Sequence, residues 1–288
     1  MLSKKPKPTS DGRIVAKENE LYVLKLVHEF GHVRVPEIAA ALWPKSSQES
    51  GEKMARRTAS RLIEAGLLLA RLNAAGTSSY VLTAGGAAFL QCHQVPARDG
   101  YDIQGVCGPT FMHRSLGTMY VAHLLGMGQY AWGEYAINKD RTPFKASELR
   151  RWYQKLPDGV HLGQIQPRAD GSKIAYFHWI EVENSFKRNE DIDRVTRLAQ
   201  KFVDEIDDGG RHRFGWLTIV VPAGERHEER IVESFRRVLS SDRFDVPEMV
   251  FVVRMVVTPP QRITYLETLS LRDLAAEIGR SDSLPNYD

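Results

Sequence analysis

The first third of the chain places apolar residues at helical spacing, about 3.6 positions apart. Gly31 and Gly66 end two of these patterns, because glycine adopts the positive φ that often closes a helix. Two short apolar runs follow, and the turn at residues 75–78 between them is typical of a β-hairpin. The pattern predicts helices over residues 21–30, 35–42 and 50–65, strands over 67–72 and 80–83, and a helix over 87–90. Three helices and a hairpin predict a winged helix-turn-helix domain over residues 19–93, after a flexible tail over 1–18.

The third of these helices is expected to begin at a Ser50 cap and to carry one apolar face, with Met54, Thr58 and Leu62, and one basic face. We expect the basic face to contact DNA phosphates or base edges, with only Glu52 and Glu64 at its ends to compensate its charge. A solvated helix face and a protein-binding module are the alternatives. The candidate DNA-binding residues are Lys53, Arg56, Arg57 and Arg61, together with Arg71 of the hairpin.

The second part of the chain alternates strands and helices. Residues 94–110 are rich in Pro, Gly, Asp and Arg without periodicity, which predicts a linker before a second domain over 111–288. We expect helices over 111–127, 189–206, 225–239 and 269–278, and strands near 157–160, 175–183, 214–221 and 249–253. This order predicts an α/β fold in which helices flank a sheet. His113 and His123 are expected to be a helix-end residue and a core histidine.

Composition narrows the class of protein. The chain has 288 residues, of which 42% are hydrophobic and 26% charged, as in soluble globular proteins. Its net charge of +3 is only mildly basic, so any DNA affinity must come from local patches. Cys92 and Cys107 are the only cysteines, which favours a reducing cytoplasm over a disulfide scaffold. Because no apolar run reaches the roughly twenty residues that span a bilayer, we expect no membrane insertion.

Two glutamates end an apolar strand pattern. Trp179, Glu181 and Glu183 share one strand face, and Asp158 lies roughly twenty residues upstream at another strand. Carboxylates there pay desolvation and repel each other unless a cation lies between them, and hard divalent ions bind such oxygens. The residues therefore predict a metal site at Asp158, Glu181 and Glu183. The alternative is a strand end in solvent, with both glutamates hydrated.

Pro157-Asp158 followed by Glu181-x-Glu183 resembles the PD-(D/E)xK restriction-endonuclease-like nucleases. That resemblance implies a magnesium site and a lysine two positions after the glutamate. Here Glu183 occupies that position and Lys187 lies four residues further on. It also implies an acid from the first helix of the nuclease domain, for which Glu134 is the nearest candidate.

Both predicted domains together resemble the MOBC-class relaxases of the plasmid replication-relaxation family, through His178, Glu181, Glu183, Asn184 and Lys187. The resemblance implies nicking of one strand of double-stranded transfer-origin DNA, strand transfer, Mg²⁺ or Mn²⁺ as cofactor, and a coupling protein or relaxosome proteins as partners. In a regular strand His178 faces away from Glu181, so a packed core histidine is its alternative role. The candidate catalytic residues are Asp158, Glu181, Glu183, Lys187, His178, Asn184 and Glu134.

Two other functions fit the same residues. A non-catalytic relaxosome accessory or transcriptional regulator would keep the DNA-binding domain beside a degenerate nuclease fold. Glu183 at the usual lysine position favours that alternative. A sequence-specific double-strand endonuclease would keep the metal chemistry but would need a homodimer to cut both strands.

Overall fold

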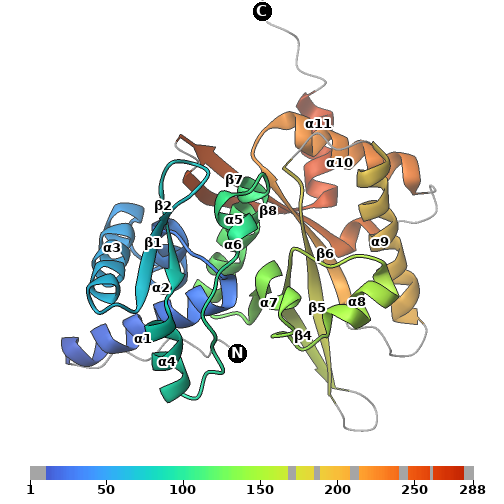
Figure 1. Ribbon diagram of the computed structural model, residues 1–288. Coiled ribbons are helices and arrows are strands. Elements are labelled where there is room, and N and C mark those ends of the chain that lie inside the picture. Colours follow the sequence, from blue (N-terminus) through green and yellow to red (C-terminus); the bar gives the residue numbers. More distant parts are fainter. Residues whose placement is uncertain are drawn as a thin grey trace, which may run out of the picture. The chain divides into compact units, whose positions relative to one another are not determined.

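The computed structural model describes residues 11–167, 173–184, 189–207, 214–239, 246–259 and 262–281. The chain is a mixed α/β protein (Figure 1). It divides into two compact units, one comprising the described residues up to Gly159 with Thr258–Thr264, the other those of Val160–Val257 and from Tyr265 on. Within the described residues, no helix is both long and apolar enough to cross a membrane.

The first unit begins with three helices, a hairpin and a fourth helix. They are α1 (Gly12–Phe30), α2 (Val35–Leu42), α3 (Gln48–Glu64), β1 (Leu68–Leu72), β2 (Ser78–Leu82) and α4 (Ala84–Cys92). Gly31 ends α1 with a φ of 74°, as the sequence predicts. β1 and β2 pair antiparallel, with Leu68 opposite Leu82. This is the element order expected of a winged helix, and that fold assignment stays a prediction.

Helix α3 differs from its prediction in two details. Ser47, not Ser50, is its N-cap, and the Ser47 hydroxyl accepts a hydrogen bond from the Ser50 N–H. Thr58 and Leu62 are buried as expected, but Met54 is 38% exposed. The buried face of α3 is therefore turned slightly away from the face expected from the sequence.

Five further elements complete the main part of the first unit. They are α5 (Ile103–Cys107), α6 (Phe111–Gly126), β3 (Ala131–Gly133), α7 (Glu134–Asn138) and α8 (Ala146–Tyr153). Helix α6 packs against α2, and a Cβ at Gly126 would lie 2.1 Å from the Ala40 carbonyl oxygen. Helix α7 packs against α1. This compact unit thus continues across the predicted linker at 94–110, and the functional domain limits stay predictions.

The second unit contains strands in the order β4-β5-β6-β7-β8, with three helices and a 3₁₀ turn. The strands are β4 (Gly159–Pro167), β5 (Lys173–Val182), β6 (Phe214–Pro222), β7 (Val250–Thr258) and β8 (Arg262–Ser270), of which β4 and β8 begin, and β7 ends, in the first unit. The remaining elements are α9 (Asn189–Asp207), α10 (Glu225–Val238), η1 (Val246–Met249) and α11 (Leu271–Ser281). Strand β6 runs parallel to both β5 and β7.

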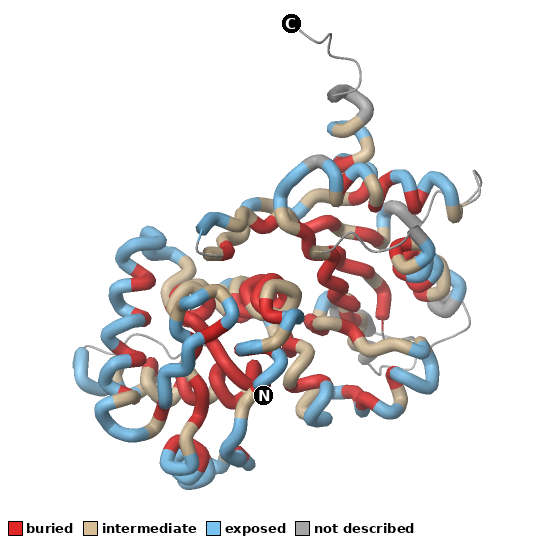
Figure 2. Tube along the Cα trace, turned by 45° about the horizontal axis from the view of Figure 1, so that its top comes forward, coloured by how far each residue is buried: buried red, intermediate tan, exposed pale blue. Residues whose placement is uncertain are grey.

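The core of the second unit lies between the central strands and α9. Trp179 on β5 is fully buried, with its ring 5.7 Å from that of Phe202 on α9 and 5.1 Å from that of Phe214 on β6. Helices α9 and α10 pack against each other and both contact β6. Strand β6 is buried over nearly its whole length (Figure 2), as its continuous apolar run predicts.

Candidate metal site

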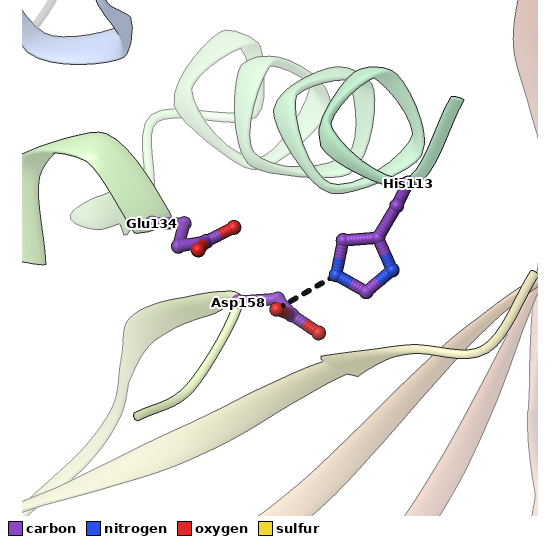
Figure 3. A group of neighbouring side chains, drawn as sticks. All are labelled: His113, Glu134 and Asp158. Carbon is purple, nitrogen blue, oxygen red and sulfur yellow. Dashed lines mark hydrogen bonds and ion pairs between the residues drawn. The ribbon is translucent and has the colours of Figure 1, made fainter. Parts of the chain in front are cut away.

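Three potential metal ligands meet in the first unit: His113, Glu134 and Asp158 (Figure 3). One ligand atom from each lies within 4.8 Å of the others. His113 Nε2 and Asp158 Oδ1 are 2.8 Å apart. The group joins the first turn of α6, the first residue of α7 and the residue before β4, so it brings together segments that are distant in the sequence.

The local sequence fixes these positions. Phe111, buried at 2% exposure, anchors the first turn of α6, which carries His113. Gly133 precedes Glu134 and lies close to Phe30, so that a Cβ there would be 3.1 Å from the ring. Pro157 is buried and precedes Asp158. Each ligand therefore lies one or two positions after a buried residue.

Arg114 connects the group to a further acid. Its Nη1 lies 2.5 Å from Glu134 Oε2, and its Nε lies 3.5 Å from Asp102 Oδ2. Burial raises the pKa of Glu134 to about 7, while Arg114 lowers it and Asp158 raises it. A divalent cation beside Glu134 would favour the ionised carboxylate and lower this pKa.

The cavity at this site is large enough for one water molecule or one metal ion. A cavity of about 10 Å³ is lined by all three ligands and by Arg114, which is about the space of one water molecule. Imidazole nitrogen is a ligand of transition metals, whereas Mg²⁺ is bound mainly by oxygen. One imidazole and two carboxylates therefore fit a divalent ion, and they suit Mn²⁺ or Zn²⁺ better than Mg²⁺.

Glu181 and Glu183 belong to the second unit and are both buried, at 2% and 5% exposure. Glu181 Oε1 accepts a hydrogen bond of 2.5 Å from Trp179 Nε1. The alternative of a hydrated strand end is therefore wrong. Because Asp158 belongs to the first unit, an ion shared by Asp158, Glu181 and Glu183 stays a prediction. Asn184 is half-buried just after β5, and Lys187 lies outside the described residues.

His178 lies in a row of rings on the second unit. Its ring stacks on His161 at 3.9 Å and on Trp216 at 4.8 Å, and its Nδ1 is 3.2 Å from Thr218 Oγ1. Burial lowers the pKa of His178 to about 2, with a smaller contribution from His161. These are the contacts of a packed, neutral histidine, and a catalytic role for it stays a prediction.

The basic residues of α3 differ in their partners. Lys53 and Arg57 are exposed, and Arg56 pairs with Glu52 at 2.8 Å. Arg61 pairs with Glu20 of α1 at 2.5 Å, so the expectation that only Glu52 and Glu64 compensate this face is wrong. Glu20 lies 41 positions earlier and gives no local signal.

Arg71 on β1 holds its guanidinium 5.9 Å from the Tyr101 ring centre. This cation–π contact holds the Arg71 side chain against an aromatic ring and does not pair its charge with a carboxylate. DNA contact by Arg71 and by the α3 residues stays a prediction.

Sequence reasoning missed His113 as a ligand and Arg114 altogether. His113 reaches Asp158 across 45 positions, and neither position has a motif that points to the other. The one hint in the sequence was that His113 and Arg114 lie in the first turn of a predicted helix, upstream of the candidate acids Glu134 and Asp158.

No protein-family model matches the chain, and no curated protein matches it. Among solved structures, the chain is similar to the restriction endonuclease FokI bound to DNA, at 10% identity over 78% of this chain and 67% of that chain. The TM-score is 0.19, which is too low to carry an argument about fold or function.

Proposed function

We propose that the chain binds DNA and nicks one strand in a reaction that depends on a divalent ion. The observation that carries the proposal is the convergence of His113, Glu134 and Asp158 on one small cavity. The resemblance to MOBC-class relaxases adds a transfer origin as the DNA and relaxosome proteins as partners. The restriction-endonuclease-like fold of the second domain belongs to the same proposal.

The residues have separate roles in it. His113, Glu134 and Asp158 would hold the ion, with Glu181 and Glu183 as further candidates from the sequence. When bound, the ion supplies Lewis-acid stabilisation of the scissile phosphate. Arg114 pairs with Glu134 and Asp102 and would hold the Glu134 carboxylate in position beside the ion. Lys187 and Asn184 remain candidates for phosphate contact on the basis of the resemblance.

DNA binding is assigned to the first four helices and the hairpin, as a winged helix with α3 in the major groove. Lys53 and Arg57 are exposed, and no ion pair involves either of them in the described chain, so both are available to phosphates. Arg56 and Arg61 would have to share their charge with Glu52 and Glu20. Contacts of this kind depend strongly on salt.

A second candidate function is a non-catalytic DNA-binding accessory or regulator. It is favoured by the compensation already present at the cluster, where Arg114 pairs with Glu134 and His113 pairs with Asp158. A guanidinium and an imidazole ring placed in this way could hold the two acids in place without an ion.

Plasmid cleavage separates the two functions. Supercoiled plasmid carrying the DNA that flanks the gene is incubated with the protein and Mn²⁺ or Mg²⁺. Open circles indicate the proposed nickase, linear DNA a dimeric double-strand endonuclease, and intact plasmid with a retarded band a binder. Asp158→Asn should abolish nicking and leave the retarded band, whereas Glu233→Gln, an exposed carboxylate on α10, should leave both unchanged.

Metal binding is tested separately, without DNA, by calorimetric titration of Mn²⁺. We expect Asp158→Asn and Glu134→Gln each to weaken Mn²⁺ binding by about tenfold or more, because each removes a charged ligand. Binding to Glu233→Gln should equal that to the unaltered protein. Equal affinity in all four proteins would place the ion elsewhere and contradict this site.

A further inference from the structure

A second cavity of the first unit is far larger than the metal cavity. It has a volume of about 820 Å³ and is lined by α1, residues 93–99 and residues 135–141. Small-molecule sites in proteins typically occupy about 300–1,000 Å³. Tyr135, which follows the metal-site residue Glu134, lines both cavities. The cavity is therefore large enough for a nucleotide and adjoins the candidate metal site.

Cationic side chains outnumber acidic ones in this cavity. Four cations, Lys25, Arg98, Lys139 and Arg141, face three carboxylates. One of those carboxylates, Asp140, already accepts a hydrogen bond of 2.7 Å from the Ala146 N–H. No ion pair involves Lys25, Arg98 or Lys139 within the described ranges. The excess positive charge favours an anionic ligand.

Tyr135 and Arg141 give the cavity a fixed wall. Arg141 Nη1 donates a hydrogen bond of 2.5 Å to the His28 carbonyl oxygen in the last turn of α1. The Arg141 guanidinium lies 5.7 Å and the Lys139 ammonium 5.5 Å from the Tyr135 ring centre. These cation–π contacts position two positive charges around one aromatic ring before any ligand arrives.

Glu29 contributes an acceptor that lacks a donor. Its Oε2 is buried and has no hydrogen-bond partner among the described residues. A buried acceptor without a donor costs on the order of 1–3 kcal/mol. Burial also raises the pKa of the Glu29 carboxyl. A ligand that donates N–H groups to this carboxylate would remove both penalties.

We propose that this cavity binds a guanine nucleotide through its monophosphate and its base. Lys25, Arg98 and Lys139 hold the phosphate. Glu29 accepts hydrogen bonds from the N1–H and the 2-amino group of guanine, the base edge that offers two adjacent donors to one carboxylate. The proposal does not depend on DNA cleavage or on a metal ion.

Calorimetric titration with GMP tests the proposal, in buffer containing EDTA and no DNA, so that its outcome is independent of the nicking and Mn²⁺ experiments. We expect GMP to bind, and guanosine and IMP each to bind about tenfold or more weakly. Guanosine lacks the phosphate, and IMP lacks the 2-amino group. No binding of GMP, or equal binding of GMP and IMP, would overturn the assignment.

Variants locate the binding within the cavity. Arg98→Gln and Glu29→Gln should each weaken GMP binding by about tenfold, because the first removes a phosphate contact and the second replaces an acceptor by a donor. Arg98 is exposed, so this variant should fold even if the Glu29 variant does not. Arg236→Gln, on the exposed side of α10, is the matched charge control and should bind GMP normally. GMP affinity unchanged by Arg98→Gln would contradict the proposed site.

A guanine base with one phosphate could belong to a free nucleotide or to the 5′ end of a DNA strand. Competition against bound GMP distinguishes these sources. A short single strand with a 5′-phosphorylated guanine that displaces GMP would identify a strand terminus, whereas failure to displace it would identify a free nucleotide. Both results support the site, because both require GMP to be bound first.

Discussion

The stacked histidines His161 and His178 should make the second unit sensitive to acid. Burial lowers the pKa of His161 to about 4 and that of His178 to about 2. An unfolded histidine titrates near 6.5, so below that pH the unfolded chain binds protons that the folded unit excludes. The unfolding free energy is therefore highest above about pH 6.5, and it falls as the pH drops from there toward the pKa values of the folded state.

The size of the effect follows from these pKa values. From about pH 7.5 to about pH 5, each histidine should cost about 2 kcal/mol of unfolding free energy, and the pair about 4 kcal/mol. His161→Phe keeps a ring in the stack and removes one titrating group. Its unfolding free energy should therefore fall by about 2 kcal/mol less than that of the unaltered protein over this range.

Hydrogen exchange of the β5 and β6 amides measures the unfolding of this unit directly. Trp216→Phe is the control, because it reduces the stack without removing a titrating group, and its loss of stability should be equal at both pH values. If the unfolding free energies of the unaltered protein and of His161→Phe fall by the same amount on acidification, the two buried neutral histidines do not cause the acid sensitivity, and the prediction is wrong.

Three other changes test packing and DNA binding. Ser234→Ala removes a buried hydroxyl 2.9 Å from Thr196 Oγ1 and should lower the unfolding free energy in urea by about 1–3 kcal/mol, whereas an unchanged midpoint would contradict this contact. Gly126→Ala would place a Cβ 2.1 Å from the Ala40 carbonyl oxygen and should cost at least about 1–3 kcal/mol, seen as a lower melting temperature. Arg57→Gln should weaken duplex DNA binding and reduce the slope of log affinity against log salt by about 0.9, and an unchanged slope would show that Arg57 does not contact phosphate.

Much of the secondary structure could be predicted because it depends on local chemistry. Gly31 ends α1 in the left-handed conformation that glycine favours. The apolar run of β6 gives a buried strand. Strand β8 was not predicted, because Ile263 is its one buried side chain and its other residues are partly or fully exposed. A partly exposed strand of this kind does not show the continuous or alternating pattern that identifies β6.

The buried and half-buried acids also differ in whether their partners could be predicted from the sequence. Trp179 and Glu181 share a strand face two positions apart, so the sequence itself places an indole N–H beside the carboxylate, where it donates a hydrogen bond. Glu181 therefore has a local partner that helps to offset its burial. Glu134 depends instead on Arg114, and Asp158 on His113, and those partners come from another helix. Periodicity cannot show such pairs, because it describes which residues share a face and not which segments meet.

This difference bears on how the candidate metal site could work. The ligands His113, Glu134 and Asp158 come from segments that the fold of the first unit brings together, so the site forms only when that unit is folded. An ion bound there would stabilise the folded first unit by mass action, since the unfolded chain has no preformed group of these ligands. Loss of Mn²⁺ should then lower the melting temperature of the unaltered protein but not that of Asp158→Asn. A site used only as an ion-pair network predicts no such difference, and the melting curves with and without Mn²⁺ decide between the two.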